Sequence, residues 1–256
     1  MKEKNKGFTL VELLAVIVIL ALIALIATPI ILNVVSNGEV EKVSTTKKIE
    51  NGTAVYYNPE TGKKCESSES KSTTGTKSGC MKWYVFNDKE GNATVNVILD
   101  HNTTANVAWN STGNNSEMKE AKEALEKDTS TWKNTARLIT ANEIAKITGN
   151  TVFDASKENQ DWFCLDTNQV DTTTWCYKAQ GTSKYAWLFD YTEDCTSFGC
   201  NKSDSSTWGY WTSTTKTGTT DRAWYVFWNG SLPDYVVSTP DFGIRPVITI
   251  SKSDIS

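Results

Sequence analysis

The apolar residues of this chain are concentrated near its N-terminus. Leu13 to Ala27 is an unbroken run of fifteen Ala, Val, Ile and Leu residues. A helix from Phe8 to Leu32 would be about 37 Å long, which is enough to cross a hydrocarbon core of roughly 30 Å. The pattern therefore predicts a membrane-spanning helix over 8–32. We expect helical structure to continue outside the membrane to Tyr57, with a break near Gly38.

From residue 58 onward the pattern changes to short aromatic strands separated by polar turns. A helix-capping box, Thr140 with Glu143, begins a short helix that should end at Gly149. A second, amphipathic helix is expected over Ser116–Lys127. Strands are expected at Lys82–Phe86, Ala93–Leu99, Tyr185–Tyr191, Gly209–Ser213, Arg222–Trp228 and Phe242–Ile250. The first two strands are expected to form a hairpin, and Asn229-Gly230 signals a second hairpin turn. The fold class is therefore α+β, with a long N-terminal helix.

The residues around the start of the apolar run carry unusual chemistry. Lysines at positions 2, 4 and 6 place that end on the cytoplasmic side of a membrane. Glu12 lies inside the apolar helix, where a carboxylate costs about 2.5–3.5 kcal/mol at the bilayer centre. Such an acid needs a partner, and cleavage between Gly7 and Phe8 would create one, a primary amine. The alternative is an ordinary secretory signal, cleaved after Ala27.

The segment Lys6 to Leu14 resembles the prepilin cleavage and methylation motif of type IV pilins and type II secretion pseudopilins. This resemblance implies that a prepilin peptidase cuts after Gly7 and methylates the amine of Phe8. It implies that Glu12 pairs with the amine of a neighbouring subunit, and that Pro29 is the family's mid-helix proline. The implied partners are that peptidase, other pilin subunits and the cytoplasmic membrane.

The prepilin resemblance implies a leader over 1–7. A turn cluster, Asn58 to Gly62, places the boundary between the helix (8–57) and a domain outside the cell (58–256). Within that domain, four segments resemble the C-type-lectin-like fold of formylglycine-generating enzymes and bacterial surface proteins. They are Ala136–Glu143, Gly209–Ser213, Ala223–Asn229 and Phe242–Ile248. The resemblance implies a mixed α+β domain, but a fold does not determine a function.

Six cysteines lie in the polar part of the chain, and an even number in an exported domain indicates disulfides. Proximity in sequence suggests three pairs, although fifteen pairings are open. Zinc is the alternative, but the chain has one histidine and no Cys-x-x-Cys knuckle. The suggested pairs are Cys65–Cys80, Cys164–Cys176 and Cys195–Cys200.

Catalysis is not expected. His101 is the only histidine, with Asp100 beside it, and no nucleophile elbow or histidine pair accompanies it. We expect no cofactor. A net charge of −4 without a basic stripe also argues against nucleic acid. Arg245 is expected to pair with an acid of its own fold, a carboxylate ligand being the alternative. Calcium remains open at four loop aspartates, Asp194, Asp204, Asp221 and Asp241.

Two interpretations of the exported domain remain. In the first, the chain is a structural subunit of a pilus or pseudopilus, and its aromatic residues form a core. In the second, the domain is a lectin-like adhesin that binds a glycan or another surface ligand through exposed tryptophans. Four tryptophans distinguish the two interpretations by their exposure: Trp208, Trp211, Trp224 and Trp228. An unassembled single-pass or secreted protein is a third possibility.

Overall fold

The computed structural model describes residues 10, 14–16, 18, 47–66, 68–69, 71–72, 77–158, 162–164, 183–189, 208–228 and 230–255. The chain forms two compact units, Met1–Thr45 and Thr46–Ser256. In the first unit, the described residues are helical. Among the described residues, no helix has the length and apolar character needed to cross a membrane. Most of the predicted span over 8–32 lies outside these residues.

The second unit begins earlier than the sequence pattern predicts. Residues 47–53 are not helical, and strand β1 covers Ala54–Asn58. Val55 and Tyr57 are buried in the core, whereas Ala54 is exposed and Tyr56 is half-buried. This alternation has the period of a strand. The helix expected to reach Tyr57 therefore does not do so, and the boundary at 58 would divide β1 from its domain.

The first sheet has the strand order β12-β5-β4-β1-β2, with the short β3 beside β4. The predicted hairpin is confirmed as β4 (Cys80–Phe86) and β5 (Thr94–Leu99), which pair in antiparallel register from Trp83↔Leu99 to Phe86↔Asn96. The remaining strands are β2 (Lys63–Lys64), β3 (Lys71–Ser72) and β12 (Val247–Ser251).

The second sheet has the order β6-β11-β8-β9-β10-β7. The hairpin predicted around residues 229 and 230 is confirmed, because β9 and β10 pair antiparallel. β11 runs parallel to β8. The strands are β6 (Thr104–Val107), β7 (Trp162–Cys164), β8 (Gly209–Thr215), β9 (Arg222–Phe227), β10 (Ser231–Val236) and β11 (Phe242–Ile244).

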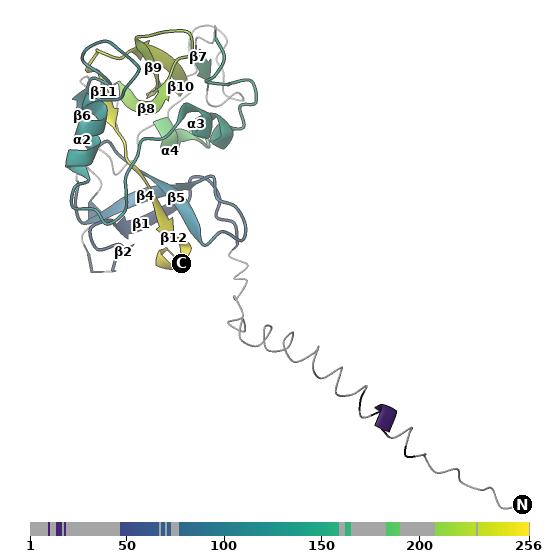
Figure 1. Cartoon of the computed structure of the whole chain (residues 1–256). Coiled ribbons are helices and arrows are strands. Elements are labelled where there is room, and N and C mark those ends of the chain that lie inside the picture. The colour runs from purple at the N-terminus through teal and green to yellow at the C-terminus, as the bar shows by residue number, and fades with distance from the viewer. Residues whose placement is uncertain are drawn as a thin grey trace, which may run out of the picture. The chain divides into compact units, whose positions relative to one another are not determined.

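The strand predicted over Phe242–Ile250 is wrong as a single element. It is divided at Arg245-Pro246, so that β11 belongs to the second sheet and β12 to the first. Proline has no N–H to donate to a sheet and restricts the residue before it. Figure 1 shows the chain passing at this point from one sheet to the other.

Helices α3 and α4 lie between the two sheets (Figure 1). α3 (Ala141–Thr148) has the predicted capping box of Thr140 and Glu143, and ends at Gly149, whose φ is 70°. α2 (Glu120–Asp128) begins later than expected. The strand predicted over Tyr185–Tyr191 is wrong where the structure describes it, since Ala186–Phe189 is the short helix α4.

A central hydrophobic core joins the sheets. Tyr84 and Phe86 face it from β4, and Trp224 and Val226 face it from β9. The alternate residues of both strands face outer clusters, including Trp83 on β4 and Tyr225 on β9. Both strands are thus buried on both faces, as the continuous apolar sequence of β9 predicts.

Glu143→Gln should destabilise the domain by about 1 kcal/mol at neutral pH, because it removes the charge that accepts two hydrogen bonds from Arg137. Burial alone raises the pKa of Glu143, but the hydrogen bonds from Arg137 and Thr140 outweigh it and lower the pKa below 4.5. Because the pKa of Glu143 is lower in the folded state than in the unfolded state, its carboxylate stabilises the fold at pH values above the unfolded-state pKa. This stabilisation is lost as the pH falls through the folded-state pKa. Urea unfolding should show the difference between the two proteins shrinking below pH 4.5. A difference independent of pH would contradict this assignment.

Candidate functional site

A buried polar junction lies where the two sheets meet, formed by Asp100, His101, Asn102 and Arg245. The guanidinium of Arg245 donates to the carbonyl oxygens of Leu99 (2.6 Å), Leu188 (2.9 Å) and Trp187 (2.8 Å). It also lies 5.1 Å from the centre of the Tyr210 ring. These contacts join β5, α4 and β8. Arg245 is therefore structural, as expected, although its hydrogen-bond acceptors are backbone carbonyls rather than the expected acid.

The other junction residues are also engaged within the fold. His101 Nδ1 lies 2.5 Å from Asp100 Oδ1, with both side chains fully buried. Asn102 donates to the carbonyl oxygen of Gly209 at 3.1 Å. The pocket here has a volume of about 10 Å³, room for about one water molecule.

Burial also shapes the chemistry of the tyrosine under Arg245. The pKa of Tyr210 is raised to about 12, chiefly by burial. Its hydroxyl donates to the Leu188 carbonyl oxygen at 2.8 Å. Tyr210 is thus a neutral hydrogen-bond donor at physiological pH, and it reinforces the attachment of α4 to the second sheet.

The four tryptophans of the final third divide between core and surface. Trp211 and Trp224 are fully buried, which confirms the core interpretation for these two. Trp228 is half-buried, and Trp208 is 48% exposed. The Trp208 ring stacks on Phe227, with 5.8 Å between centroids and 8° between planes. One tryptophan is therefore available for contact outside the domain.

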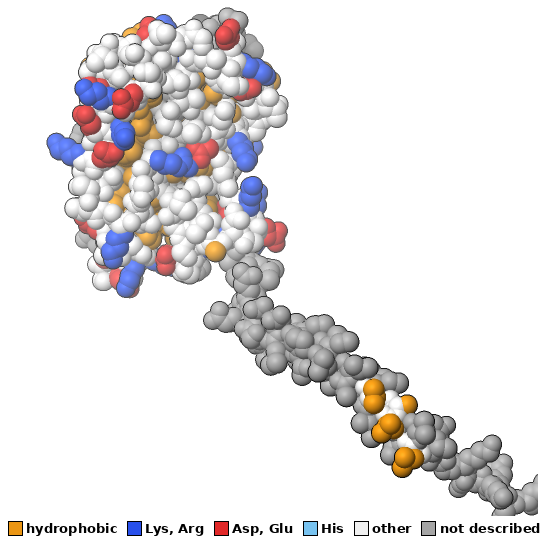
Figure 2. Space-filling view, in the orientation of Figure 1, with side chains coloured by type: hydrophobic (Ala, Val, Ile, Leu, Met, Phe, Trp, Pro, Cys, Tyr) orange, Lys and Arg blue, Asp and Glu red, His pale blue; other side chains and the backbone are white. Residues whose placement is uncertain are grey.

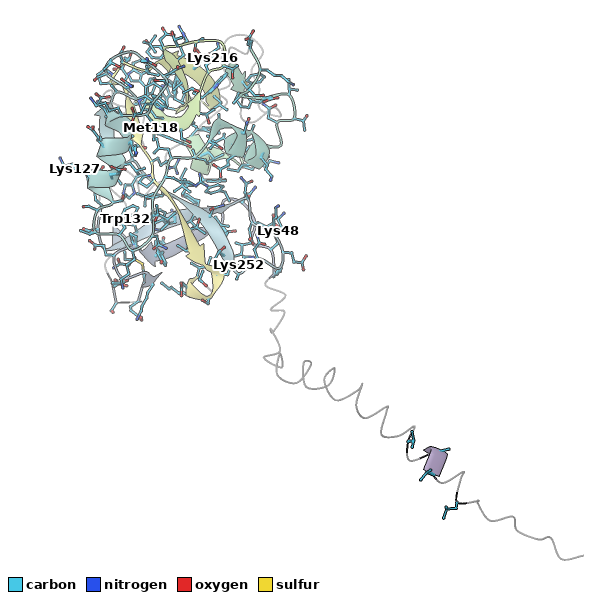
Figure 3. The ribbon with its side chains drawn as sticks, in the orientation of Figure 1. Lys48, Met118, Lys127, Trp132, Lys216 and Lys252 are labelled. Atoms are coloured by element: carbon cyan, nitrogen blue, oxygen red, sulfur yellow. A yellow bond between two sulfur atoms is a disulfide. The ribbon has the colours of Figure 1, made fainter. Side chains whose placement is uncertain are left out.

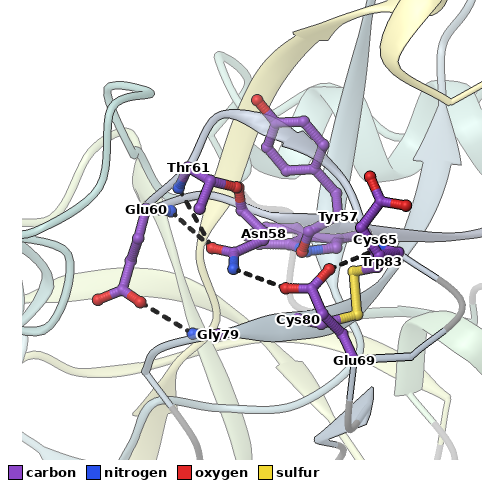
Figure 4. The surroundings of a disulfide bond; sticks show 10 residues. Tyr57, Asn58, Glu60, Thr61, Cys65, Glu69, Gly79, Cys80 and Trp83 are labelled. Atoms are coloured by element: carbon purple, nitrogen blue, oxygen red, sulfur yellow. Dashed lines mark hydrogen bonds between the residues drawn. A yellow bond between two sulfur atoms is a disulfide. The ribbon is translucent and has the colours of Figure 1, made fainter.

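The Cys65–Cys80 disulfide is present, with a Cα–Cα distance of 5.6 Å. It joins the segment after β2 to the start of β4. Figure 4 shows Glu69 beside it, accepting from the backbone N–H of Glu66 and from the side chain of Asn58. The predicted pairing of these two cysteines is thus confirmed.

Of the four cysteines in the other two predicted pairs, the structure describes only Cys164. Cys164 is disulfide-bonded, and its partner lies outside the described residues. Cys176, Cys195 and Cys200 lie outside them as well. The connectivity Cys164–Cys176 and Cys195–Cys200 therefore stays a prediction.

In the part of the chain that the structure describes, neither Asp221 nor Asp241 belongs to a group of residues that could hold a metal ion. Asp194 and Asp204 lie outside it. The group found there with metal-ligand spacing is Cys65, Glu69 and Cys80. Its two sulfur atoms are bonded to each other, so the oxidised form offers no thiolate ligands.

A buried ion pair near the start of the domain was missed by sequence reasoning. Lys252 Nζ lies 2.8 Å from Asp88 Oδ2, and the side chains are 4% and 0% exposed. Each residue lies in a polar, turn-like stretch of the sequence. No local pattern distinguishes it from a solvated charge, so only the packing of the fold identifies the pair.

The described residues at the N-terminus are apolar and exposed. Leu10, Leu14, Val16 and Val18 are helical, and Leu10 and Leu14 are 84% and 63% exposed. Figure 2 shows these side chains as an uncovered apolar group, whereas the face of the domain in view carries interspersed positive and negative side chains. These four side chains therefore form an exposed apolar surface, on which other apolar groups could pack.

Comparison with known families identifies this N-terminal segment. Residues 2–28 match the family model of the prokaryotic N-terminal methylation motif. The match includes Gly7, Phe8 and Glu12, and it ends just before Pro29. The methylation motif supports a prepilin of the type IV pilin or pseudopilin kind. The four matched or adjacent residues themselves lie outside the described residues, so their roles stay predictions.

The rest of the chain has no such match. No curated protein and no solved structure matches this chain. The resemblance of the domain to the C-type-lectin-like fold therefore gains no support from the comparisons.

Replacing Cys65 and Cys80 together by serine should lower the free energy of unfolding by about 3 kcal/mol, because the closed loop restricts the unfolded chain. The bond spans 15 residues. Denaturant unfolding of the wild type and the double variant measures the difference. As a control, reducing the wild type should produce at least the same loss. Equal stability of the two oxidised proteins would contradict the prediction.

Proposed function

We propose that this chain is a structural subunit of a type IV pilus or pseudopilus, assembled through its N-terminal helix. The match of residues 2–28 to the methylation motif carries the proposal. In the proposal, a prepilin peptidase cuts between Gly7 and Phe8 and methylates the new amine. The helix anchors the subunit in the cytoplasmic membrane until assembly, and the domain lies outside the cell.

The exposed apolar residues support this role. Leu10, Leu14, Val16 and Val18 are uncovered in the single chain, and apolar surface is stabilised by removal from water at about 25 cal/mol per Å². In the proposed role, lipid covers these side chains before assembly and the helices of other subunits cover them in the filament. The same surface serves both states.

The carboxylate of Glu12 sets the register of assembly in this proposal. A charge inside an apolar helix is costly unless it is paired. The amine of Phe8 in a neighbouring subunit offers a partner of opposite charge. Pairing would therefore favour the arrangement of helices that brings the two groups together.

Glu12→Ala should be processed normally but should not assemble. In the producing cell, mass spectrometry should find that the wild-type and variant chains both begin with methylated Phe8. Filaments sheared from the surface and counted by electron microscopy should be lost in the variant, because its helix lacks the charge that the amine requires. Glu12→Gln, which keeps the size without the charge, is the matched control and should also fail.

Two outcomes would reject the proposal at different steps. A mature chain that begins at Met1, or after Ala27, would reject prepilin processing. Wild-type filament yield from correctly processed Glu12→Ala would reject the charge pairing and leave the processing intact.

A second candidate function is binding of a glycan by the displayed domain. The observation that favours it is the exposed Trp208, stacked flat on Phe227. An indole ring fixed in this way offers one large apolar face with low loss of conformational freedom on binding. The apolar C–H face of a sugar ring matches such a surface, and the hydroxyls of the sugar can form hydrogen bonds with polar groups of the domain.

Trp208→Ala should weaken any glycan binding by about tenfold or more, because exposed tryptophans at binding sites often contribute most of the affinity. Wild type and variant would be compared on an immobilised glycan array. Tyr235, which is 41% exposed, offers a matched control, since Tyr235→Ala removes an exposed aromatic ring that is not stacked on Phe227. Absence of glycan binding by the wild type, or an equal loss of affinity in both variants, would reject Trp208 as the proposed binding surface.

A further inference from the structure

The carboxylate of Asp88 holds three separate parts of the domain together. It follows β4, at the turn toward β5, and its side chain is fully buried. Oδ2 accepts from the backbone N–H of Ile49 at 2.8 Å and contacts Lys252 Nζ at 2.8 Å. Oδ1 accepts from the backbone N–H of Lys89 at 2.8 Å. One carboxylate therefore contacts the start of the domain, its own turn and the C-terminal end.

Lys252 is fixed to the same turn by its backbone and by its side chain. It begins the short helix η2 (Lys252–Asp254), which follows β12. Its ammonium also donates to the Lys89 carbonyl oxygen at 3.2 Å, and its backbone N–H donates to the Ala93 carbonyl oxygen at 2.9 Å. Figure 3 labels Lys252 and also Lys48, the residue before Ile49.

The start of the domain has further contacts on the same turn. Gly52 donates its N–H to the Val85 carbonyl oxygen at 2.8 Å, and the side chain of Asn51 accepts from the Asn87 N–H at 2.8 Å. β1 begins directly afterwards, with Ala54 opposite Tyr84. Ile49 thus lies shortly before the first residue of β1, which is the end of β1 that would separate first from β4.

The two charges depend on each other. A buried ion that loses its partner is strongly destabilising, since neither protein nor water compensates it. The hydrogen bond from the Ile49 N–H to the Asp88 carboxylate is charge-assisted, and such hydrogen bonds are stronger than neutral ones. The hydrogen bond that holds the start of the domain at Ile49 therefore depends on Lys252 in the C-terminal turn.

We propose that Ile49, Asp88 and Lys252 form a clasp through which the C-terminal turn prevents the start of the domain from separating. The clasp couples residues 47–53 to η2, although the two lie at opposite ends of the domain sequence. It is a property of the fold and does not require the proposed function. In an anchored subunit, tension from the N-terminal helix would reach the domain at this clasp.

Hydrogen exchange followed by mass spectrometry on the full chain in detergent micelles tests the clasp. The double variant Asp88→Asn with Lys252→Met removes both charges and leaves no unpaired ion. Exchange in the peptide covering 47–53 should accelerate by about tenfold or more, the loss expected for a hydrogen bond to a charged group. Exchange in β9 and β10 should not change.

A second buried ion pair offers the matched control. Lys216 lies 2.8 Å from Asp234, with side chains 13% and 4% exposed. Asp234 also pairs with Arg222 at 2.7 Å, but the Arg222 side chain is 40% exposed and water can solvate it when Asp234 is replaced. Asp234→Asn with Lys216→Met should accelerate exchange in β10 and leave residues 47–53 protected. Equal acceleration of residues 47–53 in both double variants would show general destabilisation and overturn the clasp.

A milder change keeps the test valid if the double variant does not fold. Ser251 accepts from the Ser253 N–H and caps η2. Ser251→Ala should loosen this turn and measurably accelerate exchange at residues 47–53. Unchanged exchange there would overturn the coupling. An intact wild-type mass lower by one water would show that the amine and carboxyl have condensed to an amide, and would overturn the ionic clasp.

Discussion

Arg245 holds together the point at which the chain leaves one sheet and enters the other. A guanidinium is always charged in proteins and can only donate hydrogen bonds, so its burial requires several acceptors. The carbonyl oxygens of Leu99, Trp187 and Leu188 supply them. The two sheets and α4 must therefore be in place together before the charge is satisfied. Without this arrangement, the central core would enclose an uncompensated cation.

The same principle operates at the other end of the first sheet. Asp88 and Lys252 bury opposite charges and organise the backbone N–H of Ile49 around them. Both sites use backbone groups as partners, so each fixes the path of the chain as well as the position of a side chain. The hydrophobic core supplies most of the stability of such a domain, whereas these polar contacts select one arrangement of its segments.

In the proposed function, the chain separates assembly from display. Its N-terminal segment carries the methylation motif and an uncovered apolar surface. Its domain has a core of its own, a disulfide and an exposed tryptophan just before β8. Filament assembly through the first part would leave the surface of the second free to differ in function.

The sequence alone determined the features whose causes are local. The capping box of Thr140 and Glu143, the β4–β5 hairpin and the Cys65–Cys80 bond follow from short-range patterns, and the methylation motif occupies one continuous segment. The roles of Gly7, Phe8, Glu12 and Pro29 stay predictions from that segment.

Only the tertiary structure decided the features that depend on distant partners. β1 is a strand rather than the end of a helix because β4 lies beside it. Residues 242–250 divide between two sheets because each half pairs with a different strand. The environments of Arg245, Trp208 and Lys252 were equally undetermined, since a polar or aromatic residue in a turn-rich sequence can be buried or exposed. Burial and pairing come from segments far apart in the chain, and no local pattern encodes which of them will meet.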